Sequence, residues 1–500
     1  MKGLLSNASS KAWVGVATIG AVVVLLVFAL QLIPRLGGGQ DLIGAASPAL
    51  TDSQTAGARG GIGFISKYVD TADPLITADG GGAGEVPKLI ALVAKQSRLS
   101  AAQVRSALRR EAPHTEALLR ALPLDSITRE LVLLEAFLAE TLSMTETQVQ
   151  AALADNFPRL SQTLSALVPT GNGWNVIPQA FERFDGQPVR SVPELRTYLS
   201  DDLIAVVDRQ KGNFQKVESK GGIGYIPWLL LLVGIVVIVF GLTRARAAAG
   251  GSNPGPRDWG VVVGVGVLLL AIVLLLSYFP RLSAADKTLD AFEPAFTEER
   301  VTGTREGIAL VHEAVRFGDP IATVEGGASA EVPRLLRFIS SRTGLSRREA
   351  LSRLRGTAPR TTAVLEAIPL SVVGEEVPHL LAFLAARMRM GGNRLLLTLR
   401  KETPGLAQAL ENVAAVSVSW NSVPKLGGLE NFDGQRVRTM PQLANYFSND
   451  VVPVLDEHRE DFDKLANTWP PVTFFPPLLV IVGLLVVGYG VYGMRVVARA

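Results

Sequence analysis

The sequence predicts an all-α membrane protein with four transmembrane helices and two extracytoplasmic helical domains, built as a tandem parallel repeat. Three observations predict this fold class. Four long runs carry no charged side chain, the segments between them follow helical periodicity, and most motifs occur twice in the same order. The composition agrees, because 48% of the 500 residues are hydrophobic and only 19% are charged.

Each apolar run is long enough for a helix to cross the roughly 30 Å hydrocarbon layer of a bilayer. The predicted transmembrane helices span residues 12–34, 225–243, 259–280 and 474–494. Four tryptophans lie at or near the ends of these runs, where indole rings favour the membrane–water interface: Trp13, Trp228, Trp259 and Trp469.

Lysine and arginine in the short segments predict the orientation. The tails 1–11 and 495–500 and the linker 244–258 are basic, which places them and both termini in the cytoplasm. The long segments 35–224 and 281–473 then form extracytoplasmic helical domains 1 and 2. The first run resembles a signal peptide, but it matches the third run, so we expect it to be retained.

Sequence self-similarity covers nearly the whole chain. DPLITADGGGAGEVPKL (Asp73–Leu89) returns as DPIATVEGGASAEVPRL (Asp319–Leu335), and GWNVIP (Gly173–Pro178) returns as SWNSVP (Ser419–Pro424). Each copy contributes two transmembrane runs, so both copies insert the same way up. The repeats are therefore predicted to be parallel, related by a pseudo-twofold axis along the membrane normal.

A shorter similarity lies within the first external domain. Leu99–Pro123 resembles Leu142–Pro169, and Ser100 with Gln103 forms a capping-box pattern like that of Ser346 with Glu349. This spacing suits helix-pair repeats. With so few copies, a compact helical bundle is the preferred interpretation over a solenoid.

One turn and helix start is repeated in detail. FDGQPVRSVPELRTYLSDD begins at Phe184, and FDGQRVRTMPQLANYFSND begins at Phe432. Aspartate followed by glycine favours a turn, and Ser or Thr followed three residues later by Glu or Gln favours a helix start. The predicted turn and cap residues are Asp185, Gly186, Ser191, Glu194, Asp433, Gly434, Thr439 and Gln442.

The sequence predicts no catalytic residue, cofactor or metal site. The four histidines are not at metal-ligand spacing, there is no cysteine, and the glycine-rich stretch Ala78–Glu85 lacks a phosphate-binding pattern and is predicted to be a flexible loop. Acids occur in both copies: Glu85, Asp185 and Asp202, with Glu331, Asp433 and Asp450. Helix caps and surface ion pairs are the preferred roles, and a cation site or an acid–base pair is the alternative.

Glycines in the apolar runs predict close helix packing. Gly234 and Gly241 are seven residues apart, as are Gly483 and Gly490, and Gly260 with Gly264 forms a GxxxG pattern. Packing within the chain or between copies is favoured over a pore, because the runs carry no charged side chain. A homo-oligomer is left open.

These features favour a non-enzymatic integral membrane protein of the bacterial cell envelope, acting as a scaffold or as an accessory or assembly subunit. Its expected partners are the lipid bilayer and other membrane or envelope proteins. The formal charge of only +3 argues against nucleic acid. Two alternatives remain: a channel or transporter subunit for lipid or another apolar cargo, and a sensor that lacks its own output domain.

Overall fold

The computed structural model describes residues 8–218, 224–252, 255–275 and 277–499. It is 83% helical, which confirms the all-α prediction. Among the described residues, the one two-stranded sheet pairs β1 (Phe181–Glu182) with β2 (Pro188–Val189). Residues 1–7 of the predicted N-terminal tail, including Lys2, lie outside the described residues.

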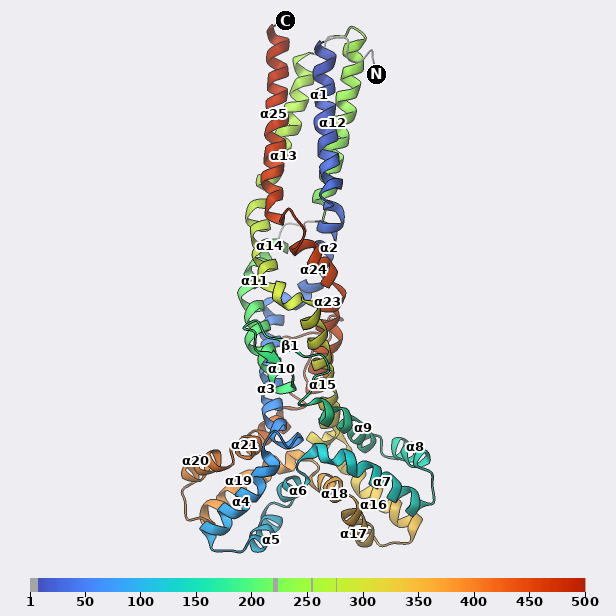
Figure 1. Ribbon diagram of the computed structural model, residues 1–500, viewed down its shortest axis with the longest axis vertical. Coiled ribbons are helices and arrows are strands. Elements are labelled where there is room, and N and C mark those ends of the chain that lie inside the picture. The colour runs from blue at the N-terminus through green and yellow to red at the C-terminus, as the bar shows by residue number, and fades with distance from the viewer. Residues whose placement is uncertain (1–7, 219–223, 253–254, 276, 500) are drawn as a thin grey trace. The chain divides into compact units, whose positions relative to one another are not determined.

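The chain divides into two compact units, each containing segments from both halves of the sequence (Figure 1). Unit 1 comprises residues 1–51, 206–298 and 454–500, and unit 2 comprises residues 52–205 and 299–453. We call residues 1–250 the first half and residues 251–500 the second half. The structure therefore groups the chain differently from the two sequence-contiguous external domains that the sequence predicts.

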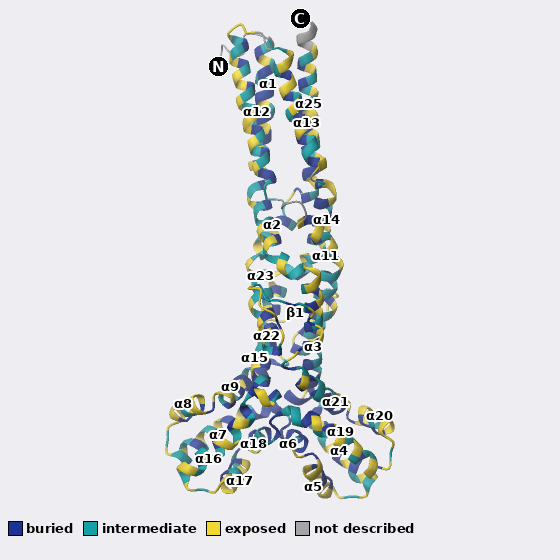
Figure 2. Ribbon diagram, turned by 180° about the vertical axis from the view of Figure 1, so that it is seen from behind, coloured by how far each residue is buried: buried dark blue, intermediate teal, exposed yellow. Residues whose placement is uncertain are grey.

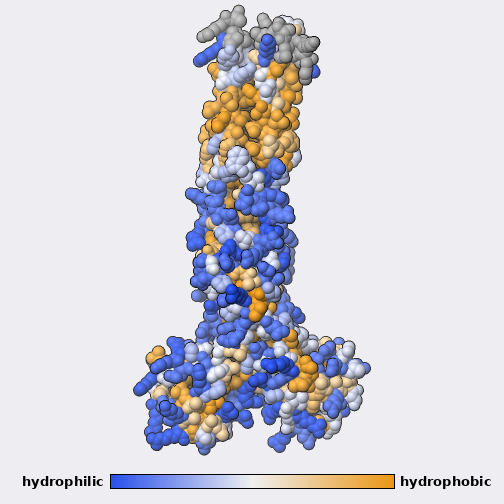
Figure 3. Space-filling view, in the orientation of Figure 1, coloured by the Kyte–Doolittle hydropathy of each residue, from blue (hydrophilic) through white to orange (hydrophobic). Residues whose placement is uncertain are grey.

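Unit 1 holds four helices that are long and apolar enough to cross a membrane. The candidate spans are Ser9–Ala29, Ile226–Ala249, Pro256–Leu275 and Val472–Arg495. The helices wholly or partly in this unit are α1 (Ala8–Ala29), α2 (Leu32–Ala46), α11 (Ile204–Glu218), α12 (Ile226–Ala249), α13 (Pro256–Leu275), α14 (Tyr278–Phe292), α23 (Val452–Glu457), α24 (Arg459–Ala466) and α25 (Phe475–Arg499). Figure 3 shows a hydrophobic surface over these spans.

The spans pair within each half, because α1 lies along α12 and α13 lies along α25. Two of the four tryptophans do not occupy the expected interfacial environment. Trp13 and Trp259 are 0% and 2% exposed and stack on each other with ring centroids 4.1 Å apart. Trp228 and Trp469, at 61% and 80% exposed, remain available to a membrane interface.

Next to the spans, the two halves exchange contacts through buried arginines. Arg35 follows α1 and is 2% exposed, and its guanidinium donates to the carbonyl oxygens of Lys464, Thr468 and Pro470 at 3.2, 2.7 and 3.0 Å. Arg281 in α14 donates in turn to the carbonyl of Val217 at 2.7 Å. Carbonyls at the end of a helix have no partner within it, so each arginine caps a helix of the other half.

Unit 2 contains the remaining helices. They are α3 (Asp52–Ile76), α4 (Gly82–Ser97), α5 (Ala101–Glu111), α6 (Pro113–Ala121), α7 (Ile127–Leu142), α8 (Glu146–Asn156), α9 (Pro158–Gly173), α10 (Val192–Thr197), α15 (Glu298–Ala322), α16 (Ala328–Thr343), α17 (Arg347–Thr357), α18 (Pro359–Ala367), α19 (Leu370–Arg387), α20 (Gly392–Glu402), α21 (Pro404–Ser419) and α22 (Met440–Asn445). One continuous hydrophobic core runs through them, with residues from both halves (Figure 2).

The bent pair α18 and α19 also passes the length and hydropathy test, which would raise the number of candidate spans to five. Its axes differ by 81°. Because Val364 and Val373 belong to the core of unit 2 and α19 carries Glu375 and Glu376, we assign this pair to unit 2 rather than to the bilayer.

Unit 2 is organised as four three-helix modules. The second helix of each module has 11 residues, and the helix after it begins at a proline. The modules are α4–α6, α7–α9, α16–α18 and α19–α21. Contacts join α4–α6 to α19–α21, which we call lobe 1, and α7–α9 to α16–α18, which we call lobe 2. Each lobe thus combines one module from each half.

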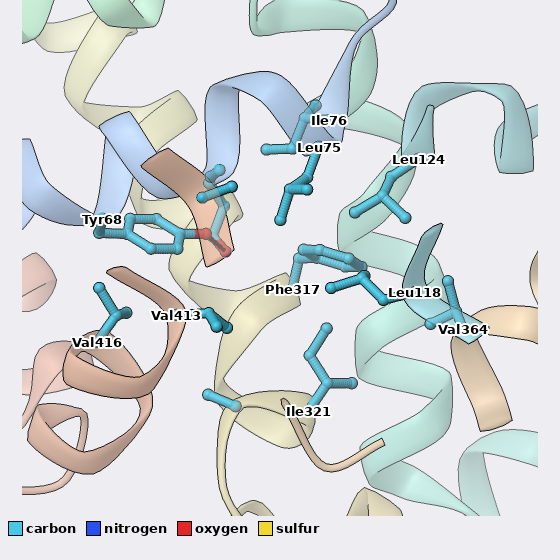
Figure 4. Packing of buried hydrophobic residues seen from close by; sticks show 14 of the residues in the cluster. Tyr68, Leu75, Ile76, Leu118, Leu124, Phe317, Ile321, Val364, Val413 and Val416 are labelled. Carbon is cyan, nitrogen blue, oxygen red and sulfur yellow. Dashed lines mark hydrogen bonds between the residues drawn. The ribbon is translucent and has the colours of Figure 1, made fainter. Parts of the chain in front are cut away.

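The core around α3 and α15 has large and small residues at corresponding positions (Figure 4). Tyr68 and Thr71 in α3 correspond in the repeat alignment to Ala314 and Phe317 in α15, so each pair joins a large residue with a smaller one. The Tyr68 hydroxyl donates to the carbonyl of Ala314 at 2.7 Å, and burial raises the pKa of Tyr68. These differences allow two similar helices to lie side by side in one core.

Candidate functional site

Four helix starts in unit 2 have the same local chemistry. The helices α6, α9, α18 and α21 begin at Pro113, Pro158, Pro359 and Pro404. A proline in the first turn has no N–H, and the next two N–H groups have no acceptor within the helix. The positive end of the helix dipole also favours a negative group there. Each of these starts therefore requires an acceptor from elsewhere.

In lobe 1, two glutamates supply the acceptors, each from the other half of the chain. Glu85 in α4 accepts from the backbone N–H of Gly405 and Leu406, at 3.3 and 2.8 Å. Glu376 in α19 accepts from the backbone N–H of His114 and Thr115, at 3.1 and 2.8 Å, and from the Thr115 hydroxyl at 2.8 Å. The two modules of lobe 1 thus cap each other reciprocally.

Lobe 2 repeats this arrangement. Glu331 in α16 accepts from the backbone N–H of Arg159 and Leu160, at 3.3 and 2.9 Å. Glu130 in α7 accepts from the backbone N–H of Arg360 and Thr361, both within 2.9 Å, and from the Thr361 hydroxyl at 3.2 Å. All four capping glutamates lie near the start of the first helix of a module, so one sequence position generates the four contacts.

These carboxylates are shielded from water. Glu85, Glu130 and Glu331 are 8%, 9% and 5% exposed. For Glu376, burial raises the pKa, but the hydrogen bonds from Thr115 and His114 outweigh it and hold the pKa below its ordinary value. The interaction is charge-assisted, which strengthens each hydrogen bond. Each of these carboxylates joins helices from the two halves of the chain.

The preferred role of Glu85 and Glu331 as helix caps is therefore confirmed. Glu130 and Glu376 were not anticipated as counterparts of that pair. The signal was present in the shorter repeat, because Glu130 precedes LSMTETQVQ as Glu85 precedes LSAAQVR. Each module has a glutamate 16 residues before its second helix begins, and a search for that spacing finds all four capping residues.

The repeated turn is built as its residues predict. Gly186 and Gly434 have φ of +81° and +78°, which glycine adopts without strain. Asp185 accepts from the Gln187 backbone at 3.1 Å, whereas Asn431 makes the corresponding contact to Gln435 in the second turn. Ser191 with Glu194 and Thr439 with Gln442 form complete capping boxes.

The helix that follows each cap contains a π-helical turn. Ile204 donates to the carbonyl of Leu199, and Val452 donates to that of Phe447, five residues back in each case. Asp202 and Asp450 lie within these π-helical turns. Each carboxylate accepts a hydrogen bond from the backbone of the preceding turn, from Phe184 at 3.4 Å and from Phe432 at 3.2 Å.

Each turn also rests on the long helix of the opposite half. A Cβ on Gly307 in α15 would lie 2.6 Å from Leu195, and a Cβ on Gly61 in α3 would lie 2.5 Å from Leu443. Arg300 in α15 donates to the carbonyls of Glu182 and Arg183 beside the first turn. The turn motif therefore joins the halves, as the glutamate caps do.

Asp202 and Asp450, the two helix aspartates that accept from the turns, differ in their charge environment. Arg183 makes a two-point ion pair with Asp202, at 3.0 and 3.1 Å, which raises the pKa of Arg183. The second half has Asn431 at the corresponding position, so Asp450 lacks this cation. Burial, with a further contribution from Asp433, raises the pKa of Asp450 above its ordinary value.

Substituting the two aspartates with asparagine should therefore have opposite effects. Asp202→Asn is expected to destabilise the fold by about 1–3 kcal/mol, because Arg183 loses its charged partner. Asp450→Asn is expected to stabilise it by about 0.5 kcal/mol at pH 7, discounted for solvent screening, because a carboxyl with a raised folded-state pKa resists ionisation.

Thermal unfolding of both variants between pH 3 and pH 8 measures this difference. The Asp450→Asn gain should appear as pH rises above the unfolded-state pKa of about 3.9 and disappear below it. Asn431→Arg supplies the missing cation but also removes the amide oxygen that accepts from the Gln435 backbone. It is therefore compared with Asn431→Ala, which lacks both groups, and should be the more stable of the two at pH 7. Equal effects of the two asparagine substitutions would contradict this assignment.

Four of the six glycine candidates lie at close helix contacts. A Cβ on Gly234 would lie 2.7 Å from Val24, one on Gly241 would lie 2.6 Å from Ala17, and one on Gly483 would lie 2.9 Å from Leu270. Gly490 makes a similar approach to Val263. Gly260 and Gly264 have nothing within 4 Å, so the GxxxG prediction is wrong for contacts within the chain, and Gly266 makes the close contact instead.

Gly266 and Gly264 offer a matched pair on one helix. Gly266→Ile should separate α13 from α25, because its Cβ would lie 2.8 Å from the Val487 nitrogen and 2.9 Å from the Gly483 carbonyl oxygen. Gly264→Ile should leave the pair intact. A disulfide between cysteines introduced on α13 and α25 of this cysteine-free chain reports the distance, and equal cross-linking in both variants would contradict the prediction.

The glycine-rich stretch is not the loose loop that the sequence predicts. Cβ atoms on Gly80 and Gly82 would lie 1.9 Å from the carbonyl oxygens of Asp73 and Pro74. The glycines thus allow the backbone to turn tightly against the end of α3. This compact turn leads into α4 and sets the position of Glu85.

The described residues offer little space or chemistry for a ligand within unit 2. One apolar cavity of about 60 Å³ lies between α3, α15 and α21, lined by Tyr68, Leu75 and Phe317 among others (Figure 4). Among the residues that the structure describes, no group of three or more potential metal ligands comes together. Comparison of the chain with protein-family models, with curated proteins and with solved structures gives no match in any of the three.

Proposed function

We propose that this chain is a non-enzymatic scaffold of the bacterial cell envelope, anchored by four membrane-spanning helices and built by tandem duplication. Its two lobes lie outside the cytoplasmic membrane and present surfaces to other envelope components. The basic linker 244–258 and the basic residues near both termini support this orientation.

The reciprocal glutamate caps are the observation that carries the proposal. Each lobe is assembled from both halves, and its buried carboxylates are committed to helix starts. This arrangement favours a rigid platform, because neither module of a lobe satisfies its own helix start. A lid or hinge that opened a lobe would leave two buried N–H groups without acceptors at each start.

The cavity volume also favours a scaffold over a carrier. The cavity of about 60 Å³ is far smaller than small-molecule sites, which usually enclose about 300 Å³ or more. A lipid chain would need a larger continuous space within the unit. The apolar lining of this cavity fits ordinary core packing.

Affinity purification of the full chain in mild detergent, followed by mass spectrometry, tests the scaffold directly. We expect envelope proteins to copurify in stable ratio from cells that carry a tagged chromosomal copy. A Glu85→Ala/Glu376→Ala chain, with lobe 1 weakened, should lose some partners at equal expression. Recovery of a lone protein under several detergents, or stoichiometric lipid within it, would contradict the proposal.

The joining of the halves can be tested independently. A protease site inserted in the linker between Gly250 and Gly255 permits cleavage after folding. The two fragments should remain together in detergent through unit 2. Dissociation on cleavage would show that the contacts between the halves are too weak to form a platform.

A further inference from the structure

The two lobes share one architecture but differ in charge. The helical segments of lobe 1, residues 82–121 and 370–419, contain 12 basic and 7 acidic residues. Those of lobe 2, residues 127–173 and 328–367, contain 10 basic and 8 acidic residues. Lobe 1 therefore has a formal charge of +5, which exceeds the +3 of the whole chain.

Most acids of lobe 1 are already engaged. Glu85 and Glu376 cap helices, and Glu111, Glu116 and Glu411 pair with arginines of the same lobe. Eight exposed cations of lobe 1 have no ion-pair partner among the described residues: Lys88, Lys95, Arg98, Arg105, Arg387, Arg389, Arg394 and Lys401. The surface of lobe 1 therefore carries uncompensated positive charge.

Two of these arginines occupy backbone positions that disfavour them. Arg98 and Arg389 follow the ends of α4 and α19 with φ of +57° and +52°. Glycine is the usual residue at such a helix end, because a Cβ is unfavourable in the left-handed region. The equivalent position at the end of α16 is Gly344, and that at the end of α7 is Ser143. Both arginines fall in lobe 1, where they add charge at a cost in stability.

The strained arginines lie at corresponding ends of α4 and α19, the first helices of the two modules of lobe 1. Helices α4 and α19 are in contact, and both helix ends lie toward the outer end of this lobe (Figure 1). Lys95 precedes Arg98 by three residues, and Arg394 is the third residue of α20, five residues after Arg389. These four cations thus come from both halves of the chain and lie toward one end of the lobe.

We propose that this end of lobe 1 binds an anionic polymer of the envelope whose repeating charge is a phosphate group. The inference rests on the proposed scaffold function and identifies the chemical class of one partner. Arginine binds phosphate oxygens through paired N–H groups, and several spaced cations suit a chain of charges better than a single ion.

Two other polyanionic partners fit less well. Insertion into an anionic membrane surface needs exposed apolar side chains, and the exposed large hydrophobics described in lobe 1 are only Leu397 and Val418. Single-stranded nucleic acid usually stacks its bases on aromatic rings, and no described aromatic side chain of lobe 1 is among the exposed large hydrophobics. A phosphate polymer requires neither feature.

The test uses the purified full chain in detergent with inorganic polyphosphate as the probe. Binding should weaken steeply with salt, because each neutralised phosphate releases a counterion. Arg98→Gly/Arg389→Gly should reduce the magnitude of the slope of log K against log salt by about 1.4, since each contact on a single strand contributes about 0.7. The same variant should not have a lower Tm than the wild type, because glycine relieves both strained positions.

Lobe 2 supplies the matched control. Arg347→Gln/Arg348→Gln removes the same charge from exposed positions at the start of α17 and should leave the salt slope unchanged. An equal loss in this control, or tighter binding to phosphatidylglycerol vesicles or single-stranded DNA than to polyphosphate, would overturn the inference. Absence of polyphosphate binding at low salt would also overturn it, while copurification of envelope proteins would leave the scaffold proposal standing.

Discussion

Glu376→Ala and Glu130→Ala are each expected to lower the free energy of unfolding by about 2–4 kcal/mol. Each substitution leaves two backbone N–H groups and a threonine hydroxyl without their charged acceptor in a shielded environment. Thermal or denaturant unfolding of the full chain in detergent measures the loss. The same substitutions should increase proteolysis within the affected lobe first.

Glu375→Ala is the matched control for Glu376→Ala. Glu375 is the exposed neighbour on the same helix, so its removal should change stability by less than about 0.5 kcal/mol. If both substitutions had the same effect, the carboxylate of Glu376 would not be joining the two modules.

The pH dependence of Glu376→Gln gives a second measurement. The folded-state pKa of Glu376 is depressed, so its contribution is present above the unfolded-state pKa of about 4.3 and is lost as pH falls through the folded-state value. The stability difference between wild type and Glu376→Gln should therefore be largest near neutral pH and shrink below about pH 4. A difference that grew in acid would contradict this sign.

Arg35→Leu is expected to destabilise unit 1 by about 3–5 kcal/mol, because three carbonyl oxygens lose their donor. Arg35→Lys should recover only a small part of this loss. A lysine ammonium keeps the charge but lacks the planar fork that reaches carbonyls on separate residues. The Tm of the full chain, or cross-linking between cysteines placed on α2 and α24, reports the effect.

Lys464→Ala provides the comparison for Arg35. It retains the backbone carbonyl that Arg35 contacts and removes only exposed ion pairs to Glu460 and Asp461. The expected cost is below about 1 kcal/mol. A larger loss for Lys464→Ala than for Arg35→Leu would mean that the surface charges, and not the buried guanidinium, hold α24.

Local features of this protein followed from the sequence because they depend on neighbouring residues. Uncharged runs of sufficient length predicted the four candidate spans, and the patterns around Asp185 and Ser191 predicted the turn and its capping box. Each of these structures involves only a few successive residues, so the local sequence is enough to predict it. The preferred role of Glu85 as a cap followed from the same reasoning.

The partner of each group required the tertiary structure. Nothing local to Glu85 or Glu376 indicates that its acceptor oxygens reach helix starts in the opposite half. Gly264 and Gly266 are equally small, yet only Gly266 meets a second helix, because the rotation of α13 about its axis decides which face is covered. Trp13 resembles an interfacial anchor but stacks on Trp259.

The sequence alone thus determined an all-α chain with four apolar runs and a doubly repeated turn, since helical periodicity and caps are properties of short segments. The exchange of buried contacts between the halves was decided only in the folded structure. The physical reason is that an unpaired N–H or carbonyl group requires a hydrogen-bond partner, but the local sequence does not say which residue supplies it. Packing of the whole core determines which half supplies it.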